Sequence, residues 1–183
     1  NPFIIQKIFS KKIKKKFVYF GRYNRHKNLK EFINAYISAK PSNKWSFHIY
    51  GIEDDDKYKK ELVNLVNNYN FQKSVKFNKP EFNIKRKFKI ISESWCNVLL
   101  SKSEILSLSV LEAFSMGTQS FVNKKIFFPN WIKRHLIRSK VKNAILSNNI
   151  QKIMNQNLQE KQNLKNKMKN LFKNNYELTK EKD

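Results

Sequence analysis

Cysteine, glycine and long apolar runs are scarce in this sequence, and each scarcity excludes a class of protein. The single cysteine, Cys96, rules out a disulfide framework within the chain and is typical of a reducing compartment. It stands in an apolar stretch, so we expect it to be a small buried hydrophobe. No apolar run approaches the roughly 20 residues that span a bilayer. The short apolar opening is followed by lysines, the reverse of a signal peptide.

Several catalytic arrangements that a sequence can reveal are also missing. The three glycines form no Walker-type phosphate loop, and no Ser-His-Asp arrangement is visible. The histidines have no Cys or His neighbours, although His26 could add a hydrogen bond to its loop. The adjacent acids at residues 53–56 lack metal-ligand spacing and suit the first turn of a helix. We therefore expect no metal site.

Positive charge is what the chain has in excess. Its 38 Lys and Arg against 14 Asp and Glu give a formal net charge of +24 at pH 7, and such a field attracts polyanions. Three interpretations stay open. The lysines can reflect a composition rich in Lys, Asn, Ile and Phe that keeps the protein soluble, or attraction to an anionic membrane face. Binding of nucleic acid is the least favoured, and lysines spread over all helices would count against it.

The order of apolar runs predicts one α/β domain. The chain of 183 residues, 40 % of them hydrophobic, has enough material for a full core, and because it begins at Asn1 we expect a piece of a longer protein. Alternating strands and helices predict βαβ units and a parallel sheet with helices on both faces. The predicted strands are 17–20, 45–50, 75–77, 97–100 and 119–122, and the helices are 29–37, 58–69, 82–92, 108–116, 129–138, 150–157 and 159–176.

The loop after the first predicted strand, residues 21–28, has the composition of an anion-binding loop. It begins with Gly21 and carries Arg22 and Lys27 just before a helix, where backbone N–H groups and the helix dipole favour an anion. A solvated basic loop would look the same on such a basic protein. Asn28 and Glu31 are spaced as a capping box for the helix that follows.

The loop after the fourth predicted strand carries two glutamates, Glu104 and Glu112, eight positions apart. A carboxylate accepts hydrogen bonds from two vicinal hydroxyls, so each glutamate could hold a sugar or a ribose. The amides of residues 106–109 lie at the expected helix start and could bind a diphosphate. For Glu112 an alternative stays open, because Ser109 and Glu112 also have the spacing of a capping box.

In order and spacing these loops resemble the C-terminal domain of glycosyltransferase family 4, the "glycosyl transferases group 1", whose members are two-domain GT-B enzymes. Those domains carry Gly-Arg, with a lysine five residues after the arginine, and later two glutamates eight positions apart, the second followed by alanine. The resemblance covers residues 1–123. The matching residues here are Gly21, Arg22, Lys27, Glu104, Glu112, Ala113 and Gly117, with Asn1-Pro2-Phe3, Tyr50-Gly51 and Val75-Lys76-Phe77 at the expected places.

The resemblance implies a Rossmann-like three-layer α/β fold with a long C-terminal helix, the donor-binding half of a retaining hexosyltransferase. It implies a UDP- or GDP-sugar as donor and an acceptor such as a cell-surface glycan or a lipid-linked saccharide. Arg22 and Lys27 would neutralise the leaving diphosphate, Glu104 would face the transferred sugar, and these three residues would be catalytic. Glu112 would hold the ribose. The other implied donor contacts are Gly21, Gly51, Phe77, Asn78, Leu106, Ser107 and Leu108.

Further expectations follow from the same resemblance. No metal or cofactor is needed, because cationic side chains and a helix end neutralise the diphosphate. Residues 1–16 would connect to an N-terminal acceptor domain, 17–158 would form the nucleotide-sugar-binding domain, and 159–183 the C-terminal helix and tail. Without the acceptor domain the chain should not catalyse efficient transfer. Separately from the resemblance, the basic segment 11–16 and the lysine-rich last helix predict a protein that is peripheral on the cytoplasmic membrane face. The alternative is a basic α/β module that binds nucleic acid or an anionic membrane without catalysis.

The sequence also departs from the family pattern. Ser107 stands where many members have glycine or proline, which keeps the amide but adds a side chain. The Gly-Gly and Glu often found after the fifth strand are replaced by Asn123-Lys124-Lys125-Ile126.

Overall fold

The centre of the protein is a parallel sheet. A computed structural model describes residues 12–104 and 107–180. Within them a six-stranded sheet has the order β3-β2-β1-β4-β5-β6, and every neighbouring pair is parallel. The strands are β1 (Lys14–Arg22), β2 (Ser46–Ile52), β3 (Val75–Asn78), β4 (Ser94–Leu99), β5 (Gln119–Asn123) and β6 (Ile137–Ser139). The predicted Rossmann-like parallel sheet is confirmed.

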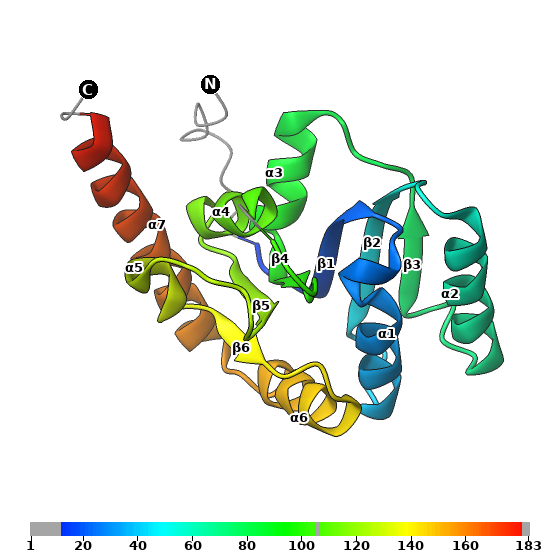
Figure 1. Ribbon diagram of the computed structural model, residues 1–183. Coiled ribbons are helices and arrows are strands. Elements are labelled where there is room, and N and C mark those ends of the chain that lie inside the picture. Colours follow the sequence, from blue (N-terminus) through cyan, green and yellow to red (C-terminus); the bar gives the residue numbers. More distant parts are fainter. Residues whose placement is uncertain (1–11, 105–106, 181–183) are drawn as a thin grey trace.

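Helices cover both faces of the sheet (Figure 1). The short 3-10 turn η1 (Arg25–Lys27) precedes α1. The α-helices are α1 (Leu29–Ser38), α2 (Asp56–Asn68), α3 (Ile84–Ser92), α4 (Leu108–Ser115), α5 (Asn130–Lys133), α6 (Asn143–Met154) and α7 (Leu158–Lys180). In Figure 1, α3 and α4 lie above the sheet and α1 and α6 lie below it, which gives three layers. The long C-terminal helix is therefore confirmed as well.

Burial explains why β1 occupies the middle of the sheet. Phe17, Val18 and Tyr19 are almost completely buried, as expected for a strand with neighbours on both sides and helices on both faces. On the side of α1, α2 and α6 an aromatic core forms around Phe17, Phe32 and Tyr36, whose rings lie 5.7 to 6.4 Å apart. A smaller core on the other face joins α4, the segment around α5, and α7.

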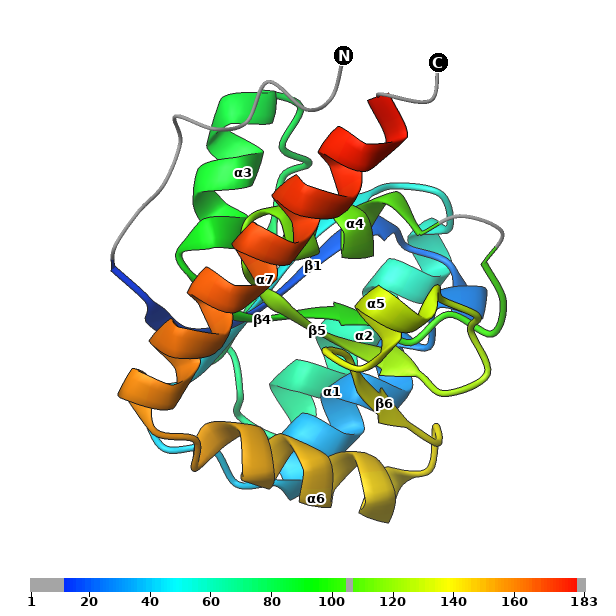
Figure 2. The same ribbon diagram turned by 90° about the vertical axis from the view of Figure 1, so that its left-hand side faces the viewer.

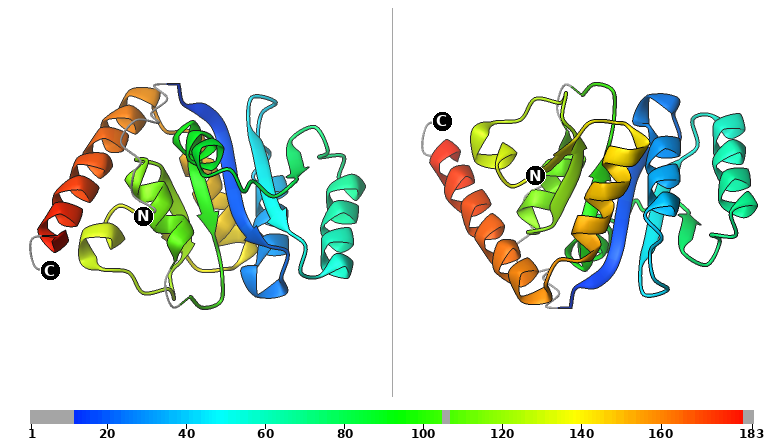
Figure 3. Two further views of the ribbon diagram at one scale, coloured as in Figure 1. Left: turned by 90° about the horizontal axis from the view of Figure 1, so that it is seen from above. Right: turned by 90° about the horizontal axis from the view of Figure 1, so that it is seen from below.

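Helix α7 closes the β5–β6 end of the molecule. It runs diagonally from the end of α6 past α5 and α4 (Figure 2), while α2 lies at the opposite end of the sheet (Figure 3). Its packing face is a stripe of apolar residues: Met168 is fully buried, and Leu164 and Leu171 pack against the same cluster. Two lysines, Lys161 and Lys165, are also buried on this face.

Two elements differ from the sequence prediction. The helix expected over residues 129–138 is wrong, because only Asn130–Lys133 is helical and Ile137–Ser139 forms the edge strand β6. Helix α6 begins at Asn143, well before the predicted start at Ile150. The domain boundaries predicted at residues 16 and 158 remain predictions.

The predicted capping box of α1 is also wrong. Asn28 does occupy the N-cap position, but it has a left-handed backbone, with φ 52°, and makes no side-chain capping bond. Its Nδ2 instead donates to the carbonyl oxygen of Leu100 at 2.7 Å. The asparagine therefore fastens the start of α1 to the loop that follows β4.

Candidate functional site

The strand order reverses between β1 and β4, where the two halves of the sheet meet. In open parallel sheets, ligands bind beyond the carboxyl ends of the strands at such a switch point. The loops that leave β1 and β4 carry the candidate residues, so the topology brings the two motifs to the same edge.

Hydrogen bonds fix these two loops against each other. Besides the Asn28–Leu100 bond, the Lys102 N–H donates to the His26 carbonyl oxygen at 2.9 Å. The Ser103 N–H donates to His26 Nε2 at 3.2 Å, and the Ser103 hydroxyl lies 3.1 Å from the same nitrogen. His26 therefore joins the loop after β1 to the loop after β4.

Lys27 and Glu104 form the closest contact between the two motifs. Lys27 Nζ lies 2.7 Å from Glu104 Oε1, and the side chains are only 18 % and 17 % exposed. Burial raises the pKa of the Glu104 carboxyl, but the hydrogen bond and the positive charge of Lys27 help to outweigh it and hold that pKa below its usual value of 4.5. The Glu104 carboxylate is therefore charged at neutral pH, and the stabilising contribution of the contact is lost as the pH falls through the lowered pKa.

Removing the lysine should reverse the direction of this shift. In Lys27→Met the burial of Glu104 remains while its main stabilising cation is gone, so we expect the pKa of Glu104 to rise above 4.5. A carbon-detected NMR titration of the glutamate carboxyls measures it. Lys30→Met is the matched control, because Lys30 pairs with Glu61 on the neighbouring surface. A Glu104 pKa that stays below 4.5 in Lys27→Met would contradict this assignment.

Glu112 points to a second lysine rather than to its own helix. Lys87 Nζ, from α3, lies 2.8 Å from Oε1 and 2.7 Å from Oε2 of Glu112. The capping-box alternative is wrong, because α4 begins at Leu108 with Ser107 as its N-cap, so Ser109 lies inside the helix. Ser107 makes no capping bond, and its buried hydroxyl has no hydrogen-bond partner among residues 12–104 and 107–180.

A cleft of about 310 Å³ lies beside this second pair, and we call it the aromatic cleft. One wall is formed by Phe20 and Tyr50, whose rings stack with centroids 4.8 Å apart and planes 10° from parallel. Lys87 lies over the Phe20 ring, with Nζ 5.6 Å from its centroid. The lining residues are Phe20, Gly21, Tyr50, Ile52, Pro80, Glu81, Phe82, Ile84, Lys87 and Glu112. A flat apolar ligand with a hydroxylated end fits this combination of surfaces.

The glycines at the ends of β1 and β2 pack closely against tyrosines. A Cβ on Gly21 would lie 2.6 Å from the Tyr19 hydroxyl oxygen, and one on Gly51 would lie 2.2 Å from ring atoms of Tyr23. Gly51 is buried and absent from the lining of the aromatic cleft. The absence of a side chain at Gly51 therefore allows the Tyr23 ring to pack closely against the backbone. Gly21, in contrast, lines the aromatic cleft.

The remaining predicted residues are spread around the same edge. The Arg22 guanidinium lies 3.6 Å from Asp54 and contacts neither glutamate. Phe77 packs 6.4 Å from the Tyr23 ring, and Asn78 Nδ2 donates to the Lys76 carbonyl oxygen at 3.2 Å. Leu108 is 59 % exposed at the start of α4. The amide of Leu106, predicted to contact phosphate, lies outside the described residues.

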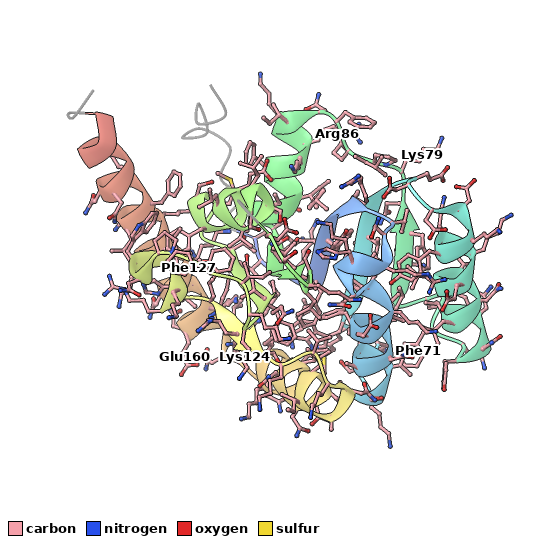
Figure 4. The ribbon with its side chains drawn as sticks, in the orientation of Figure 1. Phe71, Lys79, Arg86, Lys124, Phe127 and Glu160 are labelled. Carbon is pink, nitrogen blue, oxygen red and sulfur yellow. The ribbon has the colours of Figure 1, made fainter. Side chains whose placement is uncertain are left out.

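Sequence reasoning missed the part played by α3. No local sequence pattern marks Lys87 or the cleft residues between β3 and α3 as functional. Lys87 is one of many lysines, and only its tertiary contact with Glu112 distinguishes it. Lys79 and Arg86 flank this segment (Figure 4), and Arg86 Nε lies 3.4 Å from Glu81.

The described residues contain neither a cluster suited to a metal ion nor a helix suited to a membrane crossing. No group of three His, Cys, Asp or Glu side chains in them is arranged to hold a metal ion. Within the same part of the chain, no helix combines the length and apolar character that a bilayer crossing demands.

The strand order and the placement of both loops at the switch point define a Rossmann-like domain of the GT-B type. The sequence profile of the family "Glycosyl transferases group 1" matches residues 1–177, so the chain belongs to that family. No curated protein matches the chain.

Solved structures of similar fold include one single domain and several longer enzymes. The C-terminal domain of the glycosyl transferase group 1 family protein LpcC from Francisella tularensis superposes with a TM-score of 0.76 at 20 % identity, covering 93 % of this chain and 89 % of that one. The pneumococcal O-GlcNAc transferase GtfA, in complex with UDP and GlcNAc, gives 0.67 at 17 %, covering 94 % and 37 %. The trehalose-phosphate synthase of Burkholderia xenovorans gives 0.71 at 12 %, covering 88 % and 41 %. This chain spans less than half the length of the two longer enzymes.

Proposed function

We propose that the chain is the donor-binding domain of a retaining glycosyltransferase that uses a UDP- or GDP-sugar. The observation that carries the proposal is the pair of lysine–glutamate contacts at the switch point, Lys27–Glu104 and Lys87–Glu112, with the aromatic cleft beside the second. In this proposal Glu112 holds the ribose hydroxyls and the base lies in the aromatic cleft. The diphosphate lies toward Lys27 and the start of α4, and the transferred sugar faces Glu104.

The chemistry of the site supports this arrangement. The ammonium of Lys27 and the N–H groups at the start of α4 neutralise charge that develops on the leaving diphosphate. The unpartnered Ser107 hydroxyl offers a further hydrogen bond there. Arg22 contacts the diphosphate only if its guanidinium moves away from Asp54. Its side chain is 61 % exposed, which permits that movement. No metal or cofactor has a role in this proposal.

Two finer parts of the proposal come from neighbouring proteins. GtfA was crystallised with UDP and GlcNAc, and a trehalose-6-phosphate synthase of similar fold was studied for glycosyl transfer with retention. By extension we propose a nucleotide-diphosphate sugar as donor and retention as the stereochemical course. An N-terminal acceptor domain would be required for efficient transfer, and the acceptor would be a cell-surface glycan or a lipid-linked saccharide.

Attachment to the cytoplasmic face of an anionic membrane is a further part of the proposal. Phe127 is 85 % exposed and projects beside α5 (Figure 4), where Lys133, Arg134 and Arg138 line a neighbouring depression. An exposed aromatic ring among cations suits a lipid headgroup region. Exposed lysines also lie on α2, α3 and α7, on both faces of the sheet, which disfavours a nucleic-acid surface.

Calorimetric titration of UDP and GDP into the chain tests the proposed function. We expect one of them to bind in the millimolar range or tighter, and Glu112→Gln to weaken it about tenfold, since a hydrogen bond to a charged group contributes about 1.5 to 3 kcal/mol. The 2′-deoxy form of the nucleotide should lose most of its sensitivity to Glu112→Gln.

Glu61→Gln is the control, because Glu61 is likewise paired with a lysine but lies on α2, outside the cleft. The proposal fails if neither nucleotide binds, or if Glu61→Gln and Glu112→Gln weaken binding equally.

A further inference from the structure

A second cleft, of about 580 Å³, opens at the same edge of the sheet on the side of α1 and α6. We call it the lysine pocket after the residues that dominate its lining: Lys102, Lys124, Lys125, Lys140 and Lys142. Lys124 projects from the loop after β5, next to β6 (Figure 4). The remaining lining residues are Asn28, Glu31, Asn123 and Val141.

The charge of the lysine pocket is not neutralised by the protein. Among the described residues, none of its five lysine side chains takes part in an ion pair, and Glu31 is its only carboxylate. The first turn of α6, which starts beside Lys142, contains no acidic residue. Elsewhere in the site the lysines are paired, as Lys27 and Lys87 are. Five ammonium groups around one cleft repel one another. A bound anion would lower this electrostatic repulsion.

The backbone that carries these lysines is held in place. Asn123 Nδ2 donates to the Ser101 carbonyl oxygen at 3.0 Å, and Asn123 Oδ1 accepts from the Lys125 N–H at 3.1 Å. The Lys124 N–H donates to the Ser139 carbonyl oxygen at 2.8 Å. Asn123 is buried, so the lysines extend from a fixed wall rather than from an unsupported loop.

The pocket and the proposed donor site share the loops at the switch point. Lys102 precedes Glu104 by two residues, and Asn28 directly follows Lys27. The aromatic cleft opens on the side of α3 and α4, whereas the lysine pocket opens on the side of α1 and α6. The lysine pocket is therefore lined by residues that lie next to Lys27 and Glu104 in the sequence.

We propose that the lysine pocket binds a phosphate monoester group carried by the acceptor, which makes the acceptor a phosphorylated saccharide. Such a group has a charge of about −1.5 to −2 near pH 7 and several strong acceptor oxygens, and lysine ammoniums bind it as compact charges with three donors each. The volume admits a phosphorylated sugar ring. This inference rests on the proposed function, because only a transferase places an acceptor next to the donor sugar.

The first test uses glucose 6-phosphate as probe and glucose as its uncharged counterpart, titrated into the ¹⁵N-labelled chain. Glucose 6-phosphate is expected to shift the amide signals of Asn28, Asn123 and Val141, and glucose is not. Shifts confined to Gly21 and Ser107, at the proposed donor site, would overturn the assignment to the lysine pocket.

The second test compares two double variants with the same loss of charge. Lys124→Ala/Lys125→Ala should weaken glucose 6-phosphate binding at least about tenfold, because each lost contact to a charged group is costly. Lys44→Ala/Lys73→Ala removes two exposed lysines outside the pocket and should change it by less than about twofold. Equal effects of the two double variants would mean attraction by net charge alone and would overturn the proposal.

Two further measurements distinguish this inference from the proposed function and from membrane binding. UDP or GDP affinity should be unchanged in Lys124→Ala/Lys125→Ala; if a nucleotide binds normally but glucose 6-phosphate does not bind, the inference fails while the proposed function stands. If glucose 6-phosphate binds but no nucleotide does, the proposed function and the acceptor role fail together.

Vesicles of phosphatidylcholine with phosphatidylglycerol test whether the pocket binds lipid headgroups instead. If Lys124→Ala/Lys125→Ala loses vesicle binding but keeps glucose 6-phosphate binding, the pocket binds a membrane and the proposal is overturned.

Discussion

Replacing Lys27 by alanine is expected to weaken binding of the nucleoside diphosphate, UDP or GDP, about 100-fold. The Lys27 side chain is less than one-fifth exposed, so its attraction for a diphosphate is only partly screened, and the lost charge-assisted contact costs about 3 kcal/mol. The variant also leaves the Glu104 carboxylate without its cation, so that it would repel the diphosphate. Calorimetry on the chain measures the change directly.

Lys30→Ala is the matched control for this prediction. Lys30 lies three residues away and pairs with Glu61 at 2.5 Å, so the variant removes the same charge from a nearby pair that faces α2. Its effect on nucleotide affinity should be small. A Lys27→Ala effect no larger than that of Lys30→Ala would show that Lys27 does not contact the diphosphate.

Glu104→Gln should change the binding of two related ligands by different amounts. Glu104 holds the Lys27 ammonium at 2.7 Å and thereby competes with a diphosphate for it. Neutralising this carboxylate should therefore tighten the nucleoside diphosphate. The nucleotide sugar should gain less, because its hydroxyls lose an acceptor that is charged at neutral pH.

Much of the fold could be predicted from local sequence patterns. The apolar run at Phe17–Phe20 and its following glycine gave β1, and the periodic apolar residues of Leu29–Ile37 gave α1. The edge strand β6 could not be found in this way, because its three residues include the exposed Arg138 and are too short to show alternation. Its position is set by pairing with β5, which is a tertiary contact.

The candidate site could be predicted only as far as its motifs are local. The spacing of Gly21, Lys27 and Glu104 was readable, and the topology brings the loops that carry them to one edge of the sheet. Which side chains pair could not be predicted: Arg22 contacts Asp54, and Glu112 contacts Lys87 instead of forming a capping box with Ser109. These contacts join the loop before α2 and helix α3 to the switch point, so they depend on tertiary packing.

The same distinction between local and tertiary requirements can be measured at the end of α4, the helix that carries Glu112. Gly117 has φ +70°, and the Gly117 and Thr118 N–H groups donate to the carbonyl oxygens of Phe114 and Ala113, which is a Schellman motif. A Cβ there would lie 2.4 Å from the Lys165 carbonyl oxygen of α7. Helix α2 ends in the same motif with Asn70 at the equivalent position, where φ is 58°.

Gly117→Asn should therefore destabilise the fold by about 2 to 3 kcal/mol, because asparagine tolerates the left-handed backbone but its Cβ overlaps α7. Gly117→Ala should cost about 1 kcal/mol more, since alanine adds backbone strain. At the other motif, Asn70→Gly should change stability by less than about 0.5 kcal/mol. Urea denaturation gives the free energies of unfolding. If Gly117→Asn were as stable as Asn70→Gly, close packing of α7 on the end of α4 would not be what requires glycine here.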